Sequence, residues 1–218
     1  MTRIVVDLET APDPLREIPM PDDWLTPPGN YTKPETIADW RAKREAAWPV
    51  ERDRLASLDW RLGRIVALGW HEAGREPEAH CADSEGWLLS KLWDLIGHAA
   101  KVQLVGFGIA SFDLPWLLHR SAALRIRPPR RFRVSRYDLH SDVLDWSDVL
   151  ANYDPSKRSG WTLSRYAAVY GLPPTVGEGS SVPGWWAAGQ RDQIVDHLRG
   201  DLVTTAALDA MFWPVYGG

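Results

Sequence analysis

The sequence predicts an α/β fold with one mixed central sheet of about five strands flanked by helices. Two observations support this prediction. Short apolar runs rich in β-branched residues alternate along the chain with longer segments of helical periodicity. The 218 residues are 44% hydrophobic and 25% charged, which is typical of a globular protein with a buried core. We expect a single domain over residues 1–218, with a Pro-rich and helical insertion after the first strand, over about residues 11–60.

The first strand is expected at residues 3–8, where three consecutive β-branched residues form a run too short for a helix. From Pro12 to Pro34 the chain carries seven of its 17 prolines, a density that excludes helices and central strands. This stretch is therefore predicted to be an irregular loop. Residues 35–60 have helical spacing, and Pro49 is expected to break that helix in two.

The rest of the chain alternates between the two patterns. Apolar runs predict strands at 64–70, 78–81, 102–107 and 138–144. Apolar stripes and capping residues predict one helix that begins at Ser84. They predict further helices at 112–124, 145–151, 161–170 and 190–212. A Gly/Ser/Pro loop is expected at 171–184.

Charge and cysteine content exclude several classes of protein. The formal net charge is −4, so the chain has no overall basic surface for nucleic acid. The single cysteine, Cys81, allows neither an internal disulfide nor a cysteine-cluster zinc site, and it fits a reducing compartment. No apolar run reaches the roughly 20 residues of a membrane span, and the chain does not begin with a secretory signal pattern. We expect a cytoplasmic protein without a membrane partner.

The first candidate site residues are Asp7 and Glu9. They lie two apart at the expected end of the first strand, so their side chains point to the same face of the sheet. Two neighbouring carboxylates repel each other, and a bound divalent cation such as Mg²⁺ or Mn²⁺ relieves that repulsion. The alternative is that Asp7 caps a turn and Glu9 is solvated.

The second and third candidates lie at helices. Asp113 falls in the first turn of a helix that directly follows a strand, where an ordinary N-cap contact is the alternative role. His197 and Asp201 are four apart on the last helix and share a face, as an ordinary surface pair also would. Between them, Gly200 weakens the helix and indicates close approach of a ligand or of another part of the chain.

Taken together, these motifs resemble those of the DEDD superfamily of 3′–5′ exonucleases. The segments Val-Val-Asp-Leu-Glu-Thr (5–10) and Gly-Phe-Gly-Ile-Ala-Ser-Phe-Asp-Leu-Pro-Trp (106–116) match the first two motifs, and residues 197–201 match the third. The chain is most similar to the stand-alone predicted exonucleases related to the exonuclease domain of B-family DNA polymerases. The resemblance covers nearly the whole chain and implies a ribonuclease-H-like fold.

The resemblance also implies a reaction and a set of site residues. It implies a metal-dependent 3′–5′ exonuclease that hydrolyses single-stranded nucleic acid, with DNA favoured, to nucleoside 5′-monophosphates. Two Mg²⁺ or Mn²⁺ ions would be held by Asp7, Glu9, Asp113 and Asp201. His197 would orient or deprotonate the attacking water.

Two positions depart from the family pattern. Gly108 stands where the second motif usually has an asparagine, so an amide that could hold the substrate or the loop is missing. In the third motif, His197 stands where the tyrosine subclass has a tyrosine. The three residues between His197 and Asp201 are also the spacing of that subclass. We interpret His197 as a working base, and a degenerate site in a weakened enzyme is the other interpretation.

Further residues are candidates for substrate binding. Thr10, Gly108 and Phe112 flank the carboxylates in sequence, and Arg130 and Arg131 belong to a local cluster of arginines that extends to Arg136. An ordinary solvated loop is the alternative for that cluster. Trp185 and Trp186, after the glycine-containing loop, could stack on unpaired bases.

Three rival functions remain open at this stage. A catalytically weak or inactive nuclease fold could serve as a nucleic-acid-binding or scaffolding protein. A phosphatase could use Asp7 as a nucleophile, although Glu9 replaces the second aspartate expected there. RNA or short oligonucleotides could replace DNA as the substrate.

Overall fold

A computed structural model describes residues 1–133 and 137–217. The strands are β1 (Thr2–Pro12), β2 (Gly63–Glu72), β3 (Glu78–Cys81), β4 (Val102–Gly106) and β5 (Val143–Asp145). The helices are α1 (Pro34–Leu58), α2 (Glu85–His98), α3 (Asp113–Ala123), α4 (Trp146–Leu150), α5 (Pro155–Arg158), α6 (Leu163–Tyr170), η1 (Gly179–Ser181), α7 (Val182–Ala187) and α8 (Arg191–Tyr216). The described parts of the chain contain no helix with the length and hydropathy needed to cross a membrane.

The strands form one mixed sheet in the order β3-β2-β1-β4-β5, which confirms the predicted α/β class. The central strand, β1, pairs antiparallel with β2 and parallel with β4, and β4 pairs parallel with β5. The two β1 partners differ in extent. Pairing with β2 continues to Pro12, whereas pairing with β4 stops at Val5. Beyond Val5, β1 is therefore open on the side where β4 has ended.

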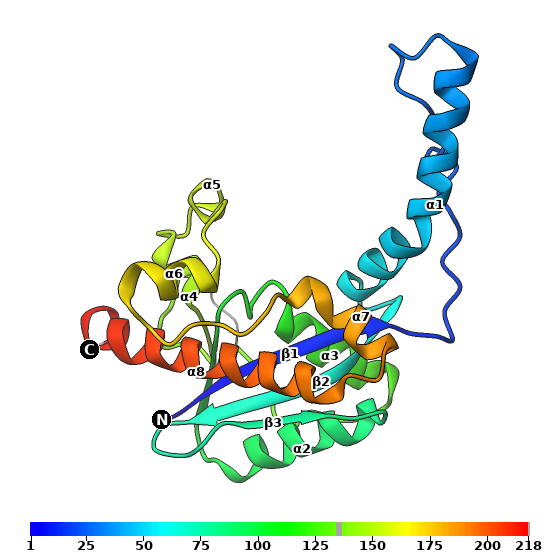
Figure 1. Cartoon of the computed structure of the whole chain (residues 1–218). Coiled ribbons are helices and arrows are strands. Elements are labelled where there is room, and N and C mark those ends of the chain that lie inside the picture. The colour runs from blue at the N-terminus through cyan, green and yellow to red at the C-terminus, as the bar shows by residue number, and fades with distance from the viewer. Residues whose placement is uncertain (134–136, 218) are drawn as a thin grey trace.

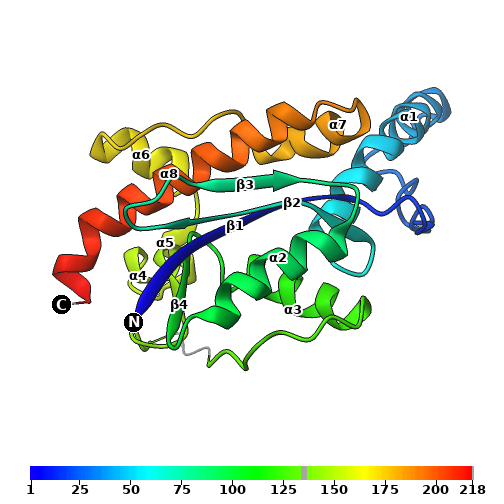
Figure 2. The same cartoon turned by 90° about the horizontal axis from the view of Figure 1, so that it is seen from below.

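Helices cover both faces of the sheet (Figure 2). Side chains of β1 alternate between the two faces, so Ile4, Val6 and Leu8 pack in the core under α2 and α3. Val5 packs in the core on the opposite face, which α8 covers together with α4, α6 and α7. The same alternation directs Asp7 and Glu9 toward the α8 face.

Residues 13–33 and α1 extend away from the sheet (Figure 1). The helix is continuous through Pro49, so the predicted break there is wrong. Figure 1 shows that α1 bends along its length, as helices with an internal proline do. The turn of α1 before Pro49 is exposed, so water can satisfy the carbonyl that Pro49 leaves unpaired. Trp48 packs edge-on against Trp24 of the Pro-rich segment, with 5.2 Å between ring centroids.

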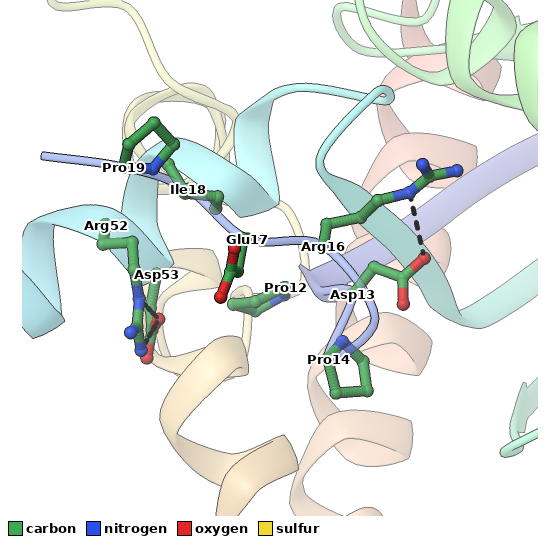
Figure 3. A pocket seen from close by; sticks show the side chains of 9 residues that line it. All are labelled: Pro12, Asp13, Pro14, Arg16, Glu17, Ile18, Pro19, Arg52 and Asp53. Atoms are coloured by element: carbon green, nitrogen blue, oxygen red, sulfur yellow. Dashed lines mark hydrogen bonds and ion pairs between the residues drawn. The ribbon is translucent and has the colours of Figure 1, made fainter. Parts of the chain in front are cut away.

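Where it leaves β1, the Pro-rich segment borders a cavity of about 710 Å³ (Figure 3). Its walls come from residues 12–19 together with Arg52 and Asp53 of α1. Acidic and basic side chains alternate around this cavity, and none of the predicted site residues lines it.

Three further boundaries differ from the sequence prediction. The strand expected at 138–144 is only three residues long and begins at Val143; just before it, the Asp142 side chain accepts a hydrogen bond from the Arg133 backbone N–H. The loop expected at 171–184 contains η1 and the start of α7, where Pro183 occupies a first-turn position that tolerates proline. Residues 155–158 form a short helix capped by Asp154, which the sequence reasoning missed.

Candidate active site

Asp7 and Glu9 lie on β1 just past the end of β4. The sequence placed them at the end of the first strand, but that strand continues to Pro12 because β2 pairs with it throughout. They pair in register with Gly69 and Ala67 of β2, before the register shift that follows Glu9. Glu9 is buried and Asp7 is half-buried, so both carboxylates lie on the sheet surface beneath α8.

Asp113 occupies the gap that β4 leaves beside β1. It is the first residue of α3, yet α3 has no side-chain cap, so the capping alternative does not apply. Instead, the buried Asp113 carboxylate accepts a hydrogen bond from the Leu8 backbone N–H, with Oδ1 3.2 Å from the nitrogen. The contact joins two residues that are 105 positions apart in sequence and places Asp113 beside Asp7 and Glu9.

His197 and Asp201 reach the same place from α8. The imidazole is almost fully buried, and its Nε2 lies 3.1 Å from Oε1 of Glu9 and 4.0 Å from Oδ2 of Asp201. The other ring nitrogen, Nδ1, donates to the Val176 carbonyl oxygen. His197 is therefore part of a buried cluster with Glu9, and the ordinary surface-pair alternative is wrong.

Burial and mutual repulsion raise the pKa values of the carboxylates in this cluster, so a nearby positive charge would be favourable. Burial, and then the charges of Asp113, Glu9 and Asp201, raise the pKa of Asp7 well above its ordinary 3.8. Burial also raises the pKa of Asp113 to about 7 and that of Asp201 to about 6. Burial alone would lower the pKa of His197, but its hydrogen bond to Glu9 and the Glu9 charge raise it to about 9.

The donor set fits a hard divalent cation. Asp113, Glu9 and Asp201 all lie close enough to Asp7 for their charges to raise its pKa, and Oδ1 of Asp201 is buried without a hydrogen-bond partner among the described residues. An orphaned buried carboxylate oxygen is costly unless a cation or proton compensates it. Within residues 1–133 and 137–217, no three His, Cys, Asp or Glu side chains are already gathered closely enough to hold a metal ion. Oε1 of Glu9 instead contacts Nε2 of His197, at 3.1 Å.

The loop from β4 to α3 is held by an aspartate that the sequence reasoning missed. Asp145, the last residue of β5, accepts hydrogen bonds from the backbone N–H groups of Gly108 and Ala110 at 2.8 and 3.0 Å. Gly108 has φ +87°, a conformation that favours glycine or asparagine, and a Cβ there would meet open space. Although Gly108 stands where the family pattern has an asparagine, the loop is still held in place, through the hydrogen bonds to Asp145. An aspartate at a strand end before a helix was the available signal.

We expect Asp145→Ala to reduce the free energy of unfolding by about 1–3 kcal/mol, because two loop N–H groups lose their acceptor. Activity should fall as well, since this loop leads directly to Asp113. Asp154→Ala is the matched control: Asp154 makes the same capping bonds to Ser156 that Asp145 makes to Ser147, but it anchors no second loop. Equal losses of stability and activity in the two variants, by thermal denaturation and nuclease assay, would contradict this role.

The other predicted substrate residues have structural partners. The Thr10 hydroxyl donates to the Ser57 carbonyl oxygen, at 2.5 Å, and so attaches β1 to α1. Phe112 packs against Trp116 in the core under α3, with 5.9 Å between ring centroids.

The predicted arginine cluster lies elsewhere. Arg130 donates to the Ala99 carbonyl oxygen just after α2. That segment runs beside α2, on the sheet face opposite α8, so the structure does not bring Arg130 and Arg131 to His197. Arg136 lies outside the described residues.

A cavity of about 470 Å³ opens beside the cluster. His197 and Asp201 form one wall, and the start of α6 and the 175–179 loop form the others. Hydroxyl groups of Thr162, Ser164 and Thr175 line it. The cluster is thus accessible from a cavity lined by polar side chains, most of which the sequence reasoning did not single out.

Fold and site together define an α/β protein of the kind that binds ligands beside the carboxyl ends of its strands, with a cluster of acidic side chains at that edge. Comparison with known proteins specifies the family. Residues 77–208, more than half of the chain, match the family model described as "Predicted 3'-5' exonuclease related to the exonuclease domain of PolB". The chain belongs to this family. The matched region contains Asp113, His197 and Asp201, whereas Asp7 and Glu9 precede it.

A solved structure shows the same fold. The family B DNA polymerase from the hyperthermophilic archaeon Pyrobaculum calidifontis superimposes with a TM-score of 0.61 and 16% sequence identity. The match covers 98% of this chain and 24% of the polymerase chain, so this chain spans about a quarter of that protein's length. The ribonuclease-H-like fold expected from the sequence is confirmed. No curated protein matches the chain in sequence.

Proposed function

We propose that this protein is a 3′–5′ exonuclease that removes nucleoside 5′-monophosphates from the 3′ end of single-stranded nucleic acid, with DNA favoured over RNA. The observation that carries the proposal is the convergence of four carboxylates and one histidine from β1, α3 and α8 at one edge of the sheet. Family membership supports the reaction class, and the polar cavity beside His197 gives a strand end access to these groups.

Asp7, Glu9, Asp113 and Asp201 would hold the Mg²⁺ or Mn²⁺ ions, two in number, that the family resemblance implies. When bound, such ions lower the pKa of a coordinated water and stabilise the leaving oxygen. Asp7 lies near enough to the other three carboxylates for their charges to raise its pKa, and Oδ1 of Asp201, which has no hydrogen-bond partner among the described residues, would be free to serve as a ligand.

His197 would take the proton from the attacking water. The water oxygen forms the new bond to phosphorus, the bond from phosphorus to the 3′ oxygen breaks, and the water proton moves to Nε2 of His197. In the structure both ring nitrogens face acceptors, so the imidazole carries a proton on each. The Nε2 proton therefore has to leave to solvent, and Glu9 has to turn away from Nε2, before Nε2 can accept the proton of the attacking water. The hydrogen bond from Nδ1 to the Val176 carbonyl can persist throughout.

The proposal is tested by incubating single-stranded DNA and RNA, labelled at the 3′ or the 5′ end, with the protein in Mg²⁺, Mn²⁺ or EDTA. A ladder that shortens from the 3′ end only in the presence of a divalent cation is the expected result, with DNA degraded faster than RNA. Degradation that persists in EDTA, or that releases nucleotides from the 5′ end, would overturn it.

His197→Ala is expected to slow this reaction by roughly 10²–10⁴-fold, the usual contribution of a positioned acid–base group. His98→Ala, at an exposed position at the end of α2, should leave the rate unchanged. Comparable rates for the wild type and His197→Ala under single-turnover conditions would show that His197 does not act as the base.

A nucleic-acid-binding protein without catalytic activity is the second candidate function. It is favoured by one observation, namely that no three ligating side chains among the described residues are already gathered around a point. Calorimetric titration with Mn²⁺ separates the two functions. Binding that disappears in Asp201→Asn supports the nuclease, and a folded protein that binds single strands without binding Mn²⁺ supports the second candidate.

A further inference from the structure

We propose that residues 173–179, which we call the glycine loop, position His197 for its role, and that Gly200 and Gly177 are the residues that allow them to do so. This inference rests on the proposed function, in which Nε2 of His197 is the proton acceptor. It adds positioning residues, of which Gly177 lines the cavity beside the cluster, whereas Val176 and Gly200 are not among its lining residues.

The first step is the hydrogen bond between the imidazole and the glycine loop. The Val176 carbonyl oxygen can only accept, so Nδ1 of His197 must carry the proton of this bond. With its proton held at Nδ1, a neutral imidazole has its lone pair at Nε2, the nitrogen that faces Glu9 and Asp201. The Val176 carbonyl therefore selects which nitrogen is the base and also fixes the direction in which the ring points.

The second step is the close approach of the glycine loop to α8. A Cβ on Gly200 would lie 2.9 Å from Cγ2 and 3.1 Å from the backbone nitrogen of Val176. Four residues after Gly200 on α8, the Thr204 hydroxyl donates to the carbonyl oxygen of Pro173, three residues before Val176 on the loop, with 2.9 Å between the oxygens. Gly200 therefore provides the space in which the Val176 carbonyl reaches His197. The close approach that its sequence position indicated is to this loop.

The third step is a contact from the other side. Trp185 of α7 packs edge-to-face against His197, with 5.9 Å between ring centroids and 68° between ring planes. Gly177 makes room for the indole: it has φ +73°, and a Cβ there would lie 2.8 Å from Cη2 of Trp185. The imidazole is thus fixed by a carbonyl on one edge and an indole beside it, and each contact depends on a glycine. Trp185 packs against the histidine, where the sequence suggested base stacking.

Gly200→Ala tests this arrangement, and Gly86→Ala is its control. Both glycines lie inside helices, but a Cβ on Gly86 would meet only Ile126 at an ordinary 3.6 Å. We expect Gly200→Ala to lower kcat roughly tenfold to a hundredfold, with KM changed by less than about threefold, because misplacement of a catalytic group by about 1 Å has an effect of that size. Gly86→Ala should retain the wild-type kcat.

A spectroscopic readout makes the test independent of activity. The Nδ1–H proton of His197, assigned in the NMR spectrum of the metal-free protein by its absence in His197→Ala, should be protected from exchange with water. It should lose that protection in Gly200→Ala and keep it in Gly86→Ala. If the wild type degrades no substrate, the proposed function fails, and this measurement still decides whether the glycine loop holds the imidazole.

Two further variants separate positioning from a general loss of structure. In the double variant Gly200→Ala with Val176→Gly, the Cβ and Cγ2 atoms of Val176 that would crowd the new alanine are gone, but the carbonyl of residue 176 remains. This variant should therefore recover at least part of the kcat and of the proton protection that Gly200→Ala loses. Adding Gly200→Ala to His197→Ala should lower kcat no further, because the residue being positioned is gone. Full additivity of the two substitutions, or unchanged proton protection in Gly200→Ala, would overturn the proposal.

Discussion

Asp7→Asn is expected to abolish the metal-dependent release of 3′ nucleotides and, at the same time, to make the metal-free protein more stable than the wild type. The activity is lost because an amide neither carries the charge nor offers the second carboxylate oxygen needed by a shared cation ligand. The stability rises because Asp7 faces three other carboxylates in a buried cluster. The replacement keeps the shape of the side chain and removes the repulsion.

The stability gain should depend on pH. The pKa of Asp7 in the folded protein is well above the ordinary 3.8, first because of burial and then because of Asp113 and the other carboxylates. The ionised form therefore weakens folding progressively as the pH rises from about 4 toward the folded pKa, and the cost is complete above that value. We expect Asp7→Asn to melt at least about 2 °C higher than the wild type at pH 8, with a smaller difference at pH 5.

The measurement is thermal denaturation of the wild type, Asp7→Asn and Asp22→Asn in EDTA at both pH values. Asp22 is exposed in the Pro-rich segment and controls for the loss of one negative charge. Mn²⁺ should then raise the melting temperature of the wild type more than that of Asp7→Asn, because an ion that binds only the folded state stabilises it. A variant that is less stable than the wild type at pH 8 would show that Asp7 contributes to folding beyond its charge.

The candidate site illustrates what could be predicted from the sequence. The sequence predicts Asp7, Glu9, Asp113, His197 and Asp201 as site residues because each belongs to a short motif whose residue types and position on a strand or helix indicate chemistry. The Val176 carbonyl could not be found in this way, since every residue carries a carbonyl and only the folded chain brings this one to His197. The contribution of Asp145 depends likewise on a loop 35–37 residues away.

The same distinction holds for the fold. Short apolar runs located β1, β2 and β4, because each of these strands is buried over most of its length. They gave the wrong length for β1, since residues 9–12 pair with β2 although their sequence, with a glutamate, an alanine and a proline, does not favour a strand. The sequence also predicts that Pro49 interrupts α1, and this prediction is wrong. The helix-breaking tendency of proline is a local property, and it takes no account of the solvent exposure of the unpaired carbonyl or of the packing of Trp48 on Trp24.

A buried ion pair that no local pattern indicated joins three elements of the fold. The Arg120 guanidinium of α3 donates from Nε and Nη2 to the two oxygens of Glu85 in α2, at 2.8 and 2.7 Å. Glu85 Oε1 also accepts from the Ile65 backbone N–H of β2 at 2.8 Å. The two side chains are 8% and 5% exposed, so water cannot replace either partner. The pair therefore connects α2, α3 and the sheet on the face opposite the candidate active site.

Arg120→Met should reduce the free energy of unfolding by about 3–5 kcal/mol, because it leaves the Glu85 carboxylate buried without its counter-charge. For a chain of this length, each 1 kcal/mol corresponds to about 2–4 °C in melting temperature, so a fall of roughly 6 °C or more is expected. The double variant Arg120→Met with Glu85→Gln should recover most of that loss. Glutamine keeps an acceptor for the Ile65 N–H while removing the unpaired charge.

Urea denaturation of the wild type, both single variants and the double variant gives the four free energies needed for a double-mutant cycle. A double variant no more stable than Arg120→Met would show that the loss comes from packing around the longer arginine side chain, and not from the orphaned charge. Because the pair lies on the face away from His197, variants that remain folded should retain the nuclease rate of the wild type at low temperature. The stability of the sheet and the chemistry at its edge therefore depend on different side chains and can be varied separately.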